Sequence, residues 1–323
     1  MKRTVSILLA LVLVFSLSVT AFADTDVIAA VDAQGNDAAE IVSLTSFDDR
    51  DGLPEEDRAV FEAAVASVMG AFEAAIKSGA IKPDEGCVAS LYDVLFVTVG
   101  EAEGLEAPYK IDITKPAGFL AMMVFNDGAW SVASVETPDD AVRFVDASSE
   151  PIALVIQSEP APAPTEAPKP VDPSAENNDA PAIAEAVDAE GEEADITIIP
   201  YRDRDELNKV YKDVFTLAYE DLYEGFDKIL ENDEKLKAAA GENNVAVSDA
   251  FFVDAADVST LNYPLSVEIE LAKFGAENPD AFVALIQYVD GVWQFVDSSV
   301  NDGVVSASIN EIGPFAVVVV AAE

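Results

Sequence analysis

Histidine is absent from the 323-residue sequence, and cysteine occurs once, at Cys87. Without imidazole the chain builds neither a Ser-His-Asp nor a Cys-His catalytic arrangement, nor a zinc site that depends on histidine. One cysteine cannot form an internal disulfide, and with no histidine to activate it we expect a partly buried, unreactive thiol. Glycine-rich phosphate loops and nucleophile-elbow motifs are missing too. The sequence therefore assigns no catalytic residue, no cofactor and no metal ligand.

Basic residues are scarce: 18 Lys and Arg stand against 61 Asp and Glu, a formal net charge of −43. Nucleic acids bind through clustered Lys and Arg, so we expect no nucleic-acid partner, and acidic substrates are disfavoured for the same reason. The excess charge favours solubility because it opposes self-association. Half of the residues are nevertheless hydrophobic, with 17 Phe and 8 Tyr. This composition predicts a folded protein with room for about two domains.

The N-terminus has the composition of a secretory signal peptide. Lys2 and Arg3 precede an apolar run over residues 7–19, and a small-x-small triplet follows. We predict a signal peptide over residues 1–23, cleaved before Asp24, and a secreted, extracellular protein. An uncleaved membrane anchor is the alternative, because the apolar run approaches the length of a spanning helix. After cleavage we expect no membrane segment, so the mature protein is released or held at a cell surface by other contacts.

A proline-rich stretch divides the chain. Residues 160–170 alternate Pro with Ala, Thr, Glu and Lys, and Ala-, Asn- and acid-rich sequence follows. Such a composition favours extended polyproline geometry and buries too little surface to fold. We predict a linker over 158–193 that holds two modules apart. Module 1 covers 41–157, after a flexible segment over 24–40, and module 2 covers 194–323.

The sequences on the two sides of this linker resemble each other. Asp-Arg-Asp occurs at 49–51 and again at 203–205, an offset of 154 residues. Asp-Gly-x-Trp occurs at 127–130 and at 290–293, an offset of 163. The order of the matches is kept along the chain, and small insertions in the second copy explain the growing offset. The pattern indicates an internal duplication.

Each copy begins with an amphipathic helix and continues with short apolar runs. Apolar residues recur every three or four positions from Phe61 to Ile76 and from Leu207 to Ile229, which predicts the two helices. The later runs are typical of β-strands, and the Asp-Gly pairs predict tight hairpins. The expected strands cover 91–99, 109–114, 119–125, 130–135, 141–145 and 152–156, then 250–253, 265–271, 281–289, 292–296, 304–309 and 315–320. The fold class we predict is α+β: two homologous modules, each a leading helix on a mainly antiparallel β-sandwich, for which an immunoglobulin-like architecture is plausible.

The end of each copy resembles a known class of repeat. A Gly-x-Trp hairpin is followed by a variable strand pair and then by Glu-Pro-Ile-Ala-Leu-Val at 150–155 or Gly-Pro-Phe-Ala-Val-Val at 313–318. This pattern is similar to tandem β-sandwich repeats in secreted and cell-surface proteins of Gram-positive bacteria. The resemblance implies an extracellular, multi-module protein without catalytic activity, and it transfers no functional residue.

The acidic turns ahead of the helices are the first candidate site. Alternating carboxylates such as those at 49–51 and 203–205 suit calcium, which binds six to eight oxygen atoms. The arginine inside each triplet counts against a cation, as do Leu53 and Leu207 where a further oxygen ligand is needed. We therefore favour turns in which Asp side chains cap backbone N–H groups and arginine pairs with a neighbouring acid.

Trp130 and Trp293 are the second candidate, as ligand-binding residues. Each lies two positions past a hairpin glycine, where an exposed ring would stack on a sugar or a peptide. Their neighbours on the same strand face, Val132 and Phe295, are apolar, which favours a place in the core.

Three classes of function remain open. The first is non-catalytic binding or adhesion to an extracellular glycan or protein, which two copies would strengthen by avidity if both engage at once. The second is a structural spacer or surface-assembly component. The third is a hydrolase built on two carboxylates, but with 61 acidic residues their closeness in sequence identifies no pair.

Overall fold

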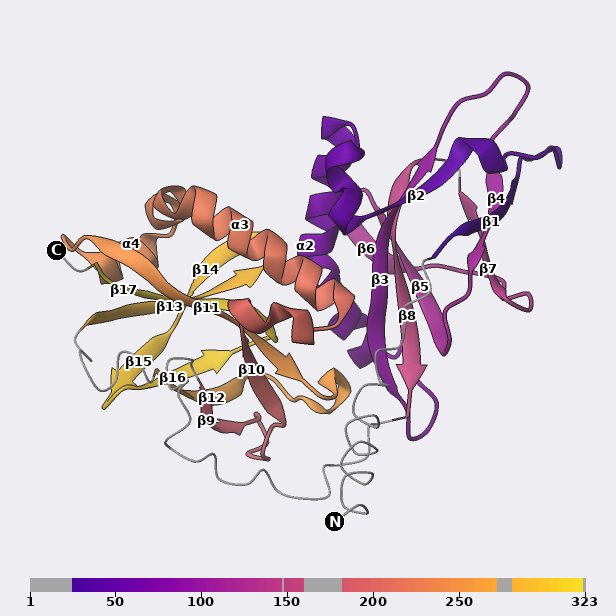
Figure 1. Ribbon diagram of the computed structural model, residues 1–323. Helices are drawn as coiled ribbons and strands as arrows, with labels where there is room; N and C mark the ends of the chain where they lie inside the picture. The colour runs from indigo at the N-terminus through magenta and orange to yellow at the C-terminus, as the bar shows by residue number, and fades with distance from the viewer. Residues whose placement is uncertain (1–24, 147, 160–181, 272–280, 322–323) are drawn as a thin grey trace, which may run out of the picture.

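The computed structural model describes residues 25–146, 148–159, 182–271 and 281–321 (Figure 1). The expected signal peptide over 1–23 and the proline-rich stretch over 160–170 lie outside the described residues. The described part is a mixed α+β fold with antiparallel sheets, which confirms the coarse fold class that the sequence predicts. We call residues 25–159 the first half and residues 182–321 the second half.

The first half consists of two antiparallel sheets and one long helix. Its elements are β1 (Val27–Val31), η1 (Ala39–Ile41), β2 (Val42–Ser46), η2 (Phe47–Gly52), α2 (Glu55–Lys77), β3 (Val88–Val99), β4 (Tyr109–Thr114), β5 (Phe119–Asn126), β6 (Ala129–Val132), β7 (Ala141–Asp146) and β8 (Glu150–Ser158). The larger sheet has the order β2-β3-β8-β5-β6, and the smaller sheet has the order β1-β4-β7.

The second half has a similar order of elements, with additions and with no counterpart of η1 among its described residues. Its elements are β9 (Ala182–Val187), β10 (Ile196–Pro200), η3 (Tyr201–Glu206), α3 (Lys209–Asn232), α4 (Glu234–Ala240), β11 (Val245–Ala255), η4 (Val258–Thr260), β12 (Leu265–Glu270), β13 (Phe282–Val289), β14 (Val292–Val296), β15 (Ser298–Asn301), β16 (Val304–Ile309) and β17 (Gly313–Val320). The larger sheet has the order β10-β11-β17-β13-β14, and the smaller sheet has the order β9-β12-β16-β15. Strand for strand, the larger sheets of the two halves have the same order.

Local sequence explains the hairpins and the ends of the first helix. Asp127 and Gly128 both have positive φ, 52° and 79°, as do Asp290 and Gly291; Asp-Gly favours such a tight turn. Both predicted hairpins, β5–β6 and β13–β14, are therefore confirmed. Helix α2 starts directly after Pro54, and acidic residues occupy its first turn.

Alternation along the strands divides the first half into three layers. On β8, Ile152 and Leu154 point toward the smaller sheet, while Ala153 and Val155 point toward the helix. Successive side chains of a strand face opposite sides, so a central strand covered on both faces reads as a continuous apolar run. The layers are thus smaller sheet, larger sheet and helix.

Two segments expected to lack structure form strands. Strand β1 lies in the segment 24–40 that we expected to be flexible, and it pairs with β4. Strand β9 lies within the expected linker 158–193 and pairs with β12. Both strands are short, five and six residues, and mix alanine with Val or Ile, so their own sequence is a weak strand signal, and pairing with a distant partner strand supplies the order. The flexible-segment prediction and the described end of the linker are corrected accordingly.

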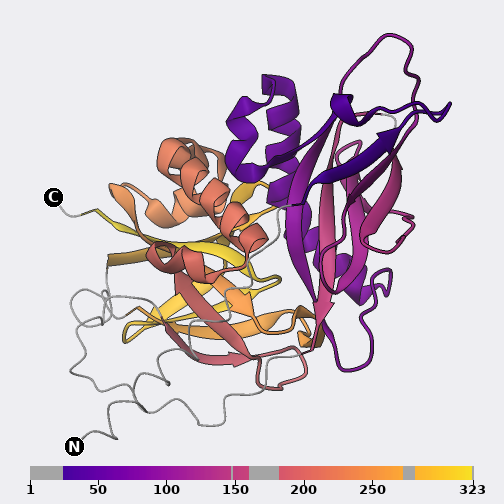
Figure 2. The same ribbon diagram turned by 45° about the vertical axis from the view of Figure 1, so that its right-hand side comes forward.

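The two halves pack against each other, which contradicts the expectation that the linker holds them apart. Figures 1 and 2 show α2 at the boundary between the halves. Besides its own sheet, α2 contacts α3, β13 and η4 of the second half, and α3 contacts β3 of the first half. One buried cluster includes Val65 and Phe72 from α2 together with Val210 and Val214 from α3. Apolar helix faces that a single module leaves open are therefore covered by the other half.

Among the described residues, α2 is the helix that is long and apolar enough to cross a membrane by length and composition. In this fold its apolar side chains, including Phe61, Val65 and Val68, are buried inside the protein. Its apolar character is therefore accounted for by its place between two packed surfaces.

Candidate functional site

The structure places each of the two tryptophans against the long helix of its own half. The indole N–H of Trp130 donates to the carbonyl oxygen of Ala64 on α2, and that of Trp293 donates to Ala218 on α3, both at 3.1 Å. Trp293 is 3 % exposed and packs on Tyr288, with ring centroids 5.4 Å apart. A ring so deeply buried has no face open to a sugar or a peptide, so Trp293 lies in the core. Trp130 is half-buried, and its N–H is likewise already used.

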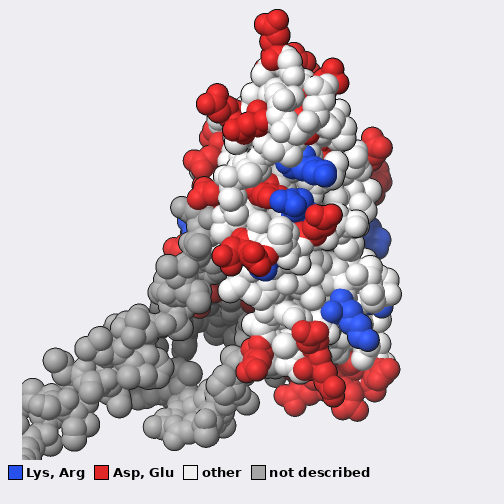
Figure 3. Space-filling view, turned by 90° about the vertical axis from the view of Figure 1, so that its right-hand side faces the viewer, with Lys and Arg blue, Asp and Glu red and all other residues white. Residues whose placement is uncertain are grey.

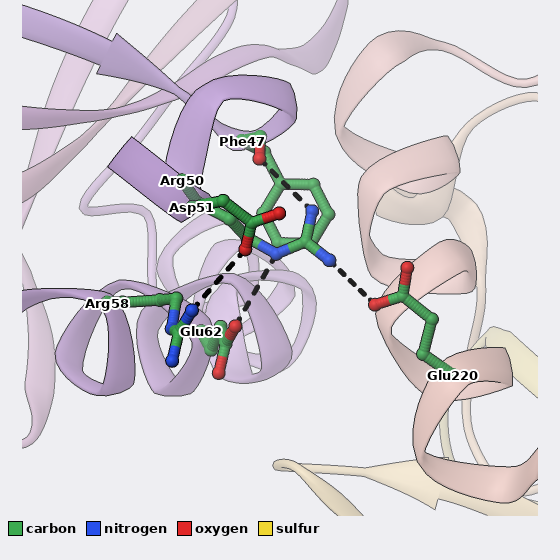
Figure 4. Close-up of polar contacts among 6 residues, drawn as sticks. All are labelled: Phe47, Arg50, Asp51, Arg58, Glu62 and Glu220. Atoms are coloured by element: carbon green, nitrogen blue, oxygen red, sulfur yellow. Dashed lines mark hydrogen bonds and ion pairs between the residues drawn. The ribbon is translucent and has the colours of Figure 1, made fainter. Parts of the chain in front are cut away.

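The acidic turn of the first half is organised around its arginine (Figure 4). The Arg50 guanidinium lies 4.0 Å from the centroid of the Phe47 ring and donates to the Phe47 carbonyl oxygen at 3.2 Å. It also donates to Glu220 of α3 at 2.6 Å and lies 3.4 Å from Glu62 of α2. The predicted pairing of arginine with a neighbouring acid is confirmed here, and one partner comes from the other half.

The corresponding turn of the second half shares the arginine's contacts with the aromatic ring and with the backbone carbonyl. Arg204 lies 4.4 Å from the centroid of the Tyr201 ring and donates to the Tyr201 carbonyl oxygen at 3.1 Å. Along the described ranges, no group of three or more acidic or cysteine side chains is arranged to hold a metal ion. In both turns the aromatic ring and the backbone carbonyl position the arginine.

A buried ion pair joins the two halves beside α3. The ammonium group of Lys209, the first residue of α3, lies 2.7 Å from Oδ2 of Asp93 on β3. Burial raises the pKa of Asp93, and the positive charge of Lys209 opposes that rise. Asp213, one turn further along α3, is 3 % exposed. Burial raises its pKa to about 7, again opposed by Lys209.

A second cluster of polar side chains joins the halves near the C-terminal end of α2. The hydroxyl of Tyr263 donates to Glu73 at 3.4 Å and accepts the backbone N–H of Ile312 at 3.2 Å. The Lys77 ammonium lies 3.9 Å from the centroid of the Tyr263 ring and 3.5 Å from Glu73. Burial, with the charge of Glu73 added, raises the pKa of Glu311 to about 7.

These carboxylates have the raised pKa values that acid–base catalysis uses, but their places in the fold do not suit a substrate. Glu73 is 5 % exposed and Asp213 is 3 % exposed, and both are packed where the halves meet. A substrate would have to separate the halves to reach either group. Their positions instead suit a structural role, in which the carboxylates hold the two halves together.

Shared contacts let positions in the two halves be matched. The tryptophans bond to helix residues 64 and 218, which are 154 positions apart. A register shift between Leu91 and Asp93 of β3 recurs between Val247 and Asp249 of β11. Asp249 therefore corresponds to Asp93, and Tyr223 on α3 corresponds to Met69 on α2.

An open groove lies between α3 and the first part of β11. It is lined by Tyr219, Leu222, Tyr223 and Phe226 of α3 and by residues 245–250, with a volume of about 360 Å³. Tyr223 is 82 % exposed. The rings of Tyr201, Tyr219 and Tyr223 form a stacked row, with successive centroids 3.6 and 6.5 Å apart. An aromatic row beside a partly exposed strand is typical of a surface that binds another molecule.

The matching groove of the first half is filled by the second half. Met69, the counterpart of Tyr223, is 7 % exposed and lies beside Gly313 of β17. Asp93, the counterpart of Asp249, binds Lys209. The same position in the fold is thus an internal interface in one half and an open surface in the other.

Sequence reasoning missed this groove, although part of its signal is visible. Tyr219, Tyr223 and Phe226 recur at helical spacing, which marks one stripe of the helix. Phe226 belongs to the apolar repeat that predicts the helix, and nothing local shows that Tyr223 is exposed while Met69 is covered. That difference depends on where the halves meet.

No protein-family model matches the chain, and no curated protein is significantly similar to it.

Proposed function

We propose that this chain is a secreted, non-catalytic binding protein built from two homologous modules. Its extracellular partner is a protein or a glycan, and the groove between α3 and β11 is where that partner binds. The proposal depends on one observation above all: the groove is open in the second half, whereas its counterpart in the first half is a protein–protein interface. A surface of the same construction that already binds protein within the chain favours a protein over a glycan.

Several shared details support a common origin of the halves. They have the same strand order in the larger sheets, a bulge at the same place, and the same tryptophan-to-helix hydrogen bond. Independent folds would have no reason to share all three. Two antiparallel sheets packed face to face also suit the immunoglobulin-like architecture and the bacterial surface repeats that the sequence resembles.

The two modules are not equivalent as binding sites. Avidity from two identical sites needs both to be accessible at once. Because the second half covers the groove of the first, we propose one such site per chain, held in a fixed orientation by the ion pairs and apolar contacts between the halves.

A structural spacer is the second candidate function. The observation that favours it is the extensive contact between the halves, which makes a stiff unit out of two small modules. A spacer needs no partner at the groove, so substitutions there would leave its role unchanged.

The test is a binding screen of the mature protein, residues 24–323, on arrays of extracellular-matrix proteins and glycans, with and without calcium. Two variants accompany it: Tyr223→Ala in the groove, and Val292→Ala as a matched control at another exposed apolar side chain, 57 % exposed on β14. We expect a protein ligand whose signal is weakened by Tyr223→Ala, unchanged by Val292→Ala and independent of calcium. If no ligand on the arrays binds, the spacer is favoured. If a ligand binds the wild-type protein and Tyr223→Ala equally well, its binding site is not the groove.

Export is tested separately. Expression of the full chain in a secreting bacterium, followed by mass analysis of the secreted protein, should show Asp24 as the first residue. Retention of residues 1–23 in a membrane fraction would support the anchor instead.

A further inference from the structure

We propose that the partner at the groove between α3 and β11 is a cationic amphipathic helix of another protein. This inference depends on the proposed function, and it adds the chemistry of the ligand. The groove supplies three features that select such a helix: an apolar floor, an adjoining acidic row, and a filled counterpart that shows how a helix enters.

The apolar floor is a stripe of α3. Tyr219, Tyr223 and Phe226 succeed each other at steps of four and three residues, so they lie on one side of the helix. Across the groove, β11 contributes partly exposed Val245 and Val247. Burying the apolar side chains of a bound helix in this groove removes them from water and so stabilises the complex. Tyrosine is a residue type that often contributes most of the binding energy at such interfaces.

An acidic row runs beside this stripe. Glu224, Asp227 and Glu231 follow the same steps one position further along α3, and all three are exposed. Glu220 begins the row and binds Arg50 at the boundary with the first half. Asp249 lines the groove from the strand side. A bound segment therefore meets apolar groups flanked by negative charge, which favours Lys and Arg beside the apolar face of the ligand.

The matching groove of the first half shows what kind of element such a groove can bind. In the first half the matching groove receives the first turns of α3: the Lys209 ammonium binds Asp93, while Val210 and Val214 enter the shared apolar cluster. The occupant there is a helix that presents a lysine and apolar side chains together. Asp249, whose Oδ2 accepts the Ser248 hydroxyl at 3.2 Å, occupies the strand position of Asp93 and adds a negative charge to the lining of the open groove.

A second copy of this chain does not match that description. The counterpart of Lys209 in the first half is Glu55, which is followed by Glu56 and Asp57 at the start of α2. These carboxylates would meet the acidic row and Asp249 at close range. Figure 3 shows acidic side chains around much of the outer face of the first half, with a few basic ones among them. The net charge of −43 opposes self-association further.

The test uses a synthetic amphipathic helix of leucine and lysine as the probe, with a leucine and glutamate helix as its charge-reversed control. Affinity is measured by fluorescence anisotropy at physiological salt. We expect the lysine helix to bind the wild-type protein, the glutamate helix not to bind, and Tyr223→Ala to weaken binding about tenfold. The control Val145→Ala, at a side chain 60 % exposed on β7, should leave the affinity unchanged.

A pair of charge variants separates the groove from diffuse attraction to an acidic protein. The groove variant carries Glu224→Lys, Asp227→Lys and Glu231→Lys, and the control carries Glu101→Lys, Glu103→Lys and Asp139→Lys at exposed positions of the first half. Both change the net charge equally. We expect the groove variant to lose more affinity than its control; equal losses would mean diffuse attraction and would overturn the assignment.

Two further outcomes would also overturn it. If sedimentation velocity shows a wild-type dimer that Tyr223→Ala abolishes, the occupant is a second copy of the chain. If the lysine helix does not bind while a protein ligand from the array still depends on Tyr223, the groove remains a binding site but its ligand is not a cationic helix. Failure of the proposed function is a different result, in which no array ligand responds to Tyr223→Ala.

Discussion

Asp213 is the buried acid whose replacement should change the pH dependence of stability most clearly. It lies on α3 with 3 % of its surface exposed, and one of its carboxylate oxygens, Oδ2, has no hydrogen-bond partner among the described residues. Burial raises its pKa from 3.8 to about 7, with the charge of Lys209 acting in the opposite direction. The folded protein therefore holds a proton on Asp213 more tightly than the unfolded chain does.

The sign and the size follow from proton linkage. A carboxyl group with a raised folded-state pKa contributes stability that is complete below its unfolded pKa and is lost as the pH rises through the folded value. Each pH unit between the two values changes the free energy of unfolding by about 1.4 kcal/mol. From about pH 5 to about pH 8, Asp213 alone should remove about 2.7 kcal/mol from the stability of the protein.

The assay is urea unfolding at these two pH values for the wild-type protein and for Asp213→Asn, which has no titrating group at this position. Glu311, with a pKa of about 7, and Asp254, with a pKa of about 6, contribute in the same direction in both proteins and cancel from the difference. Asp227→Asn, at an exposed acid of the same helix, is the matched control. If Asp213→Asn kept the full wild-type difference between the two pH values, the argument from burial at the interface would be refuted.

Three further predictions concern the contact between the halves and the helix-to-hairpin bond. Lys209→Met should destabilise the protein by about 3 kcal/mol in urea, because it leaves the buried carboxylate of Asp93 without its cation; adding Asp93→Leu should recover most of the loss. Trp293→Phe should cost about 1–2 kcal/mol in thermal unfolding, because the bond to Ala218 is lost and a small space opens, and an unchanged melting temperature would contradict the core position. A protease site inserted within residues 160–181 should, after cleavage, leave both halves eluting together in gel filtration, since the contacts between them do not depend on chain continuity; separate peaks would show that the interface is weak.

Local sequence patterns were sufficient to predict the two hairpins and the two long helices. Asp-Gly pairs predicted the β5–β6 and β13–β14 hairpins because few residues other than glycine and Asp or Asn accept positive φ at low cost. The apolar repeat predicted α2 and α3 because a helix brings every third or fourth residue to one face. Strands β1 and β9 escaped prediction because runs of only five or six residues are weak signals by themselves, and their order comes from partner strands about 80 residues away in the chain.

The sequence by itself determined that the protein has an acidic surface, no histidine chemistry, and two similar stretches of helix and strands, because composition and periodicity are properties of the chain. Only the tertiary structure decided that the halves pack together, that Lys209 meets Asp93 across 116 positions, and that Tyr223 is open where Met69 is covered. The physical reason is that similar local sequences build similar helices and strands in both halves, while burial depends on which surface the other half occupies. The open groove, and with it the candidate binding site, exists because one half has a neighbour at that position and the other has none among the described residues.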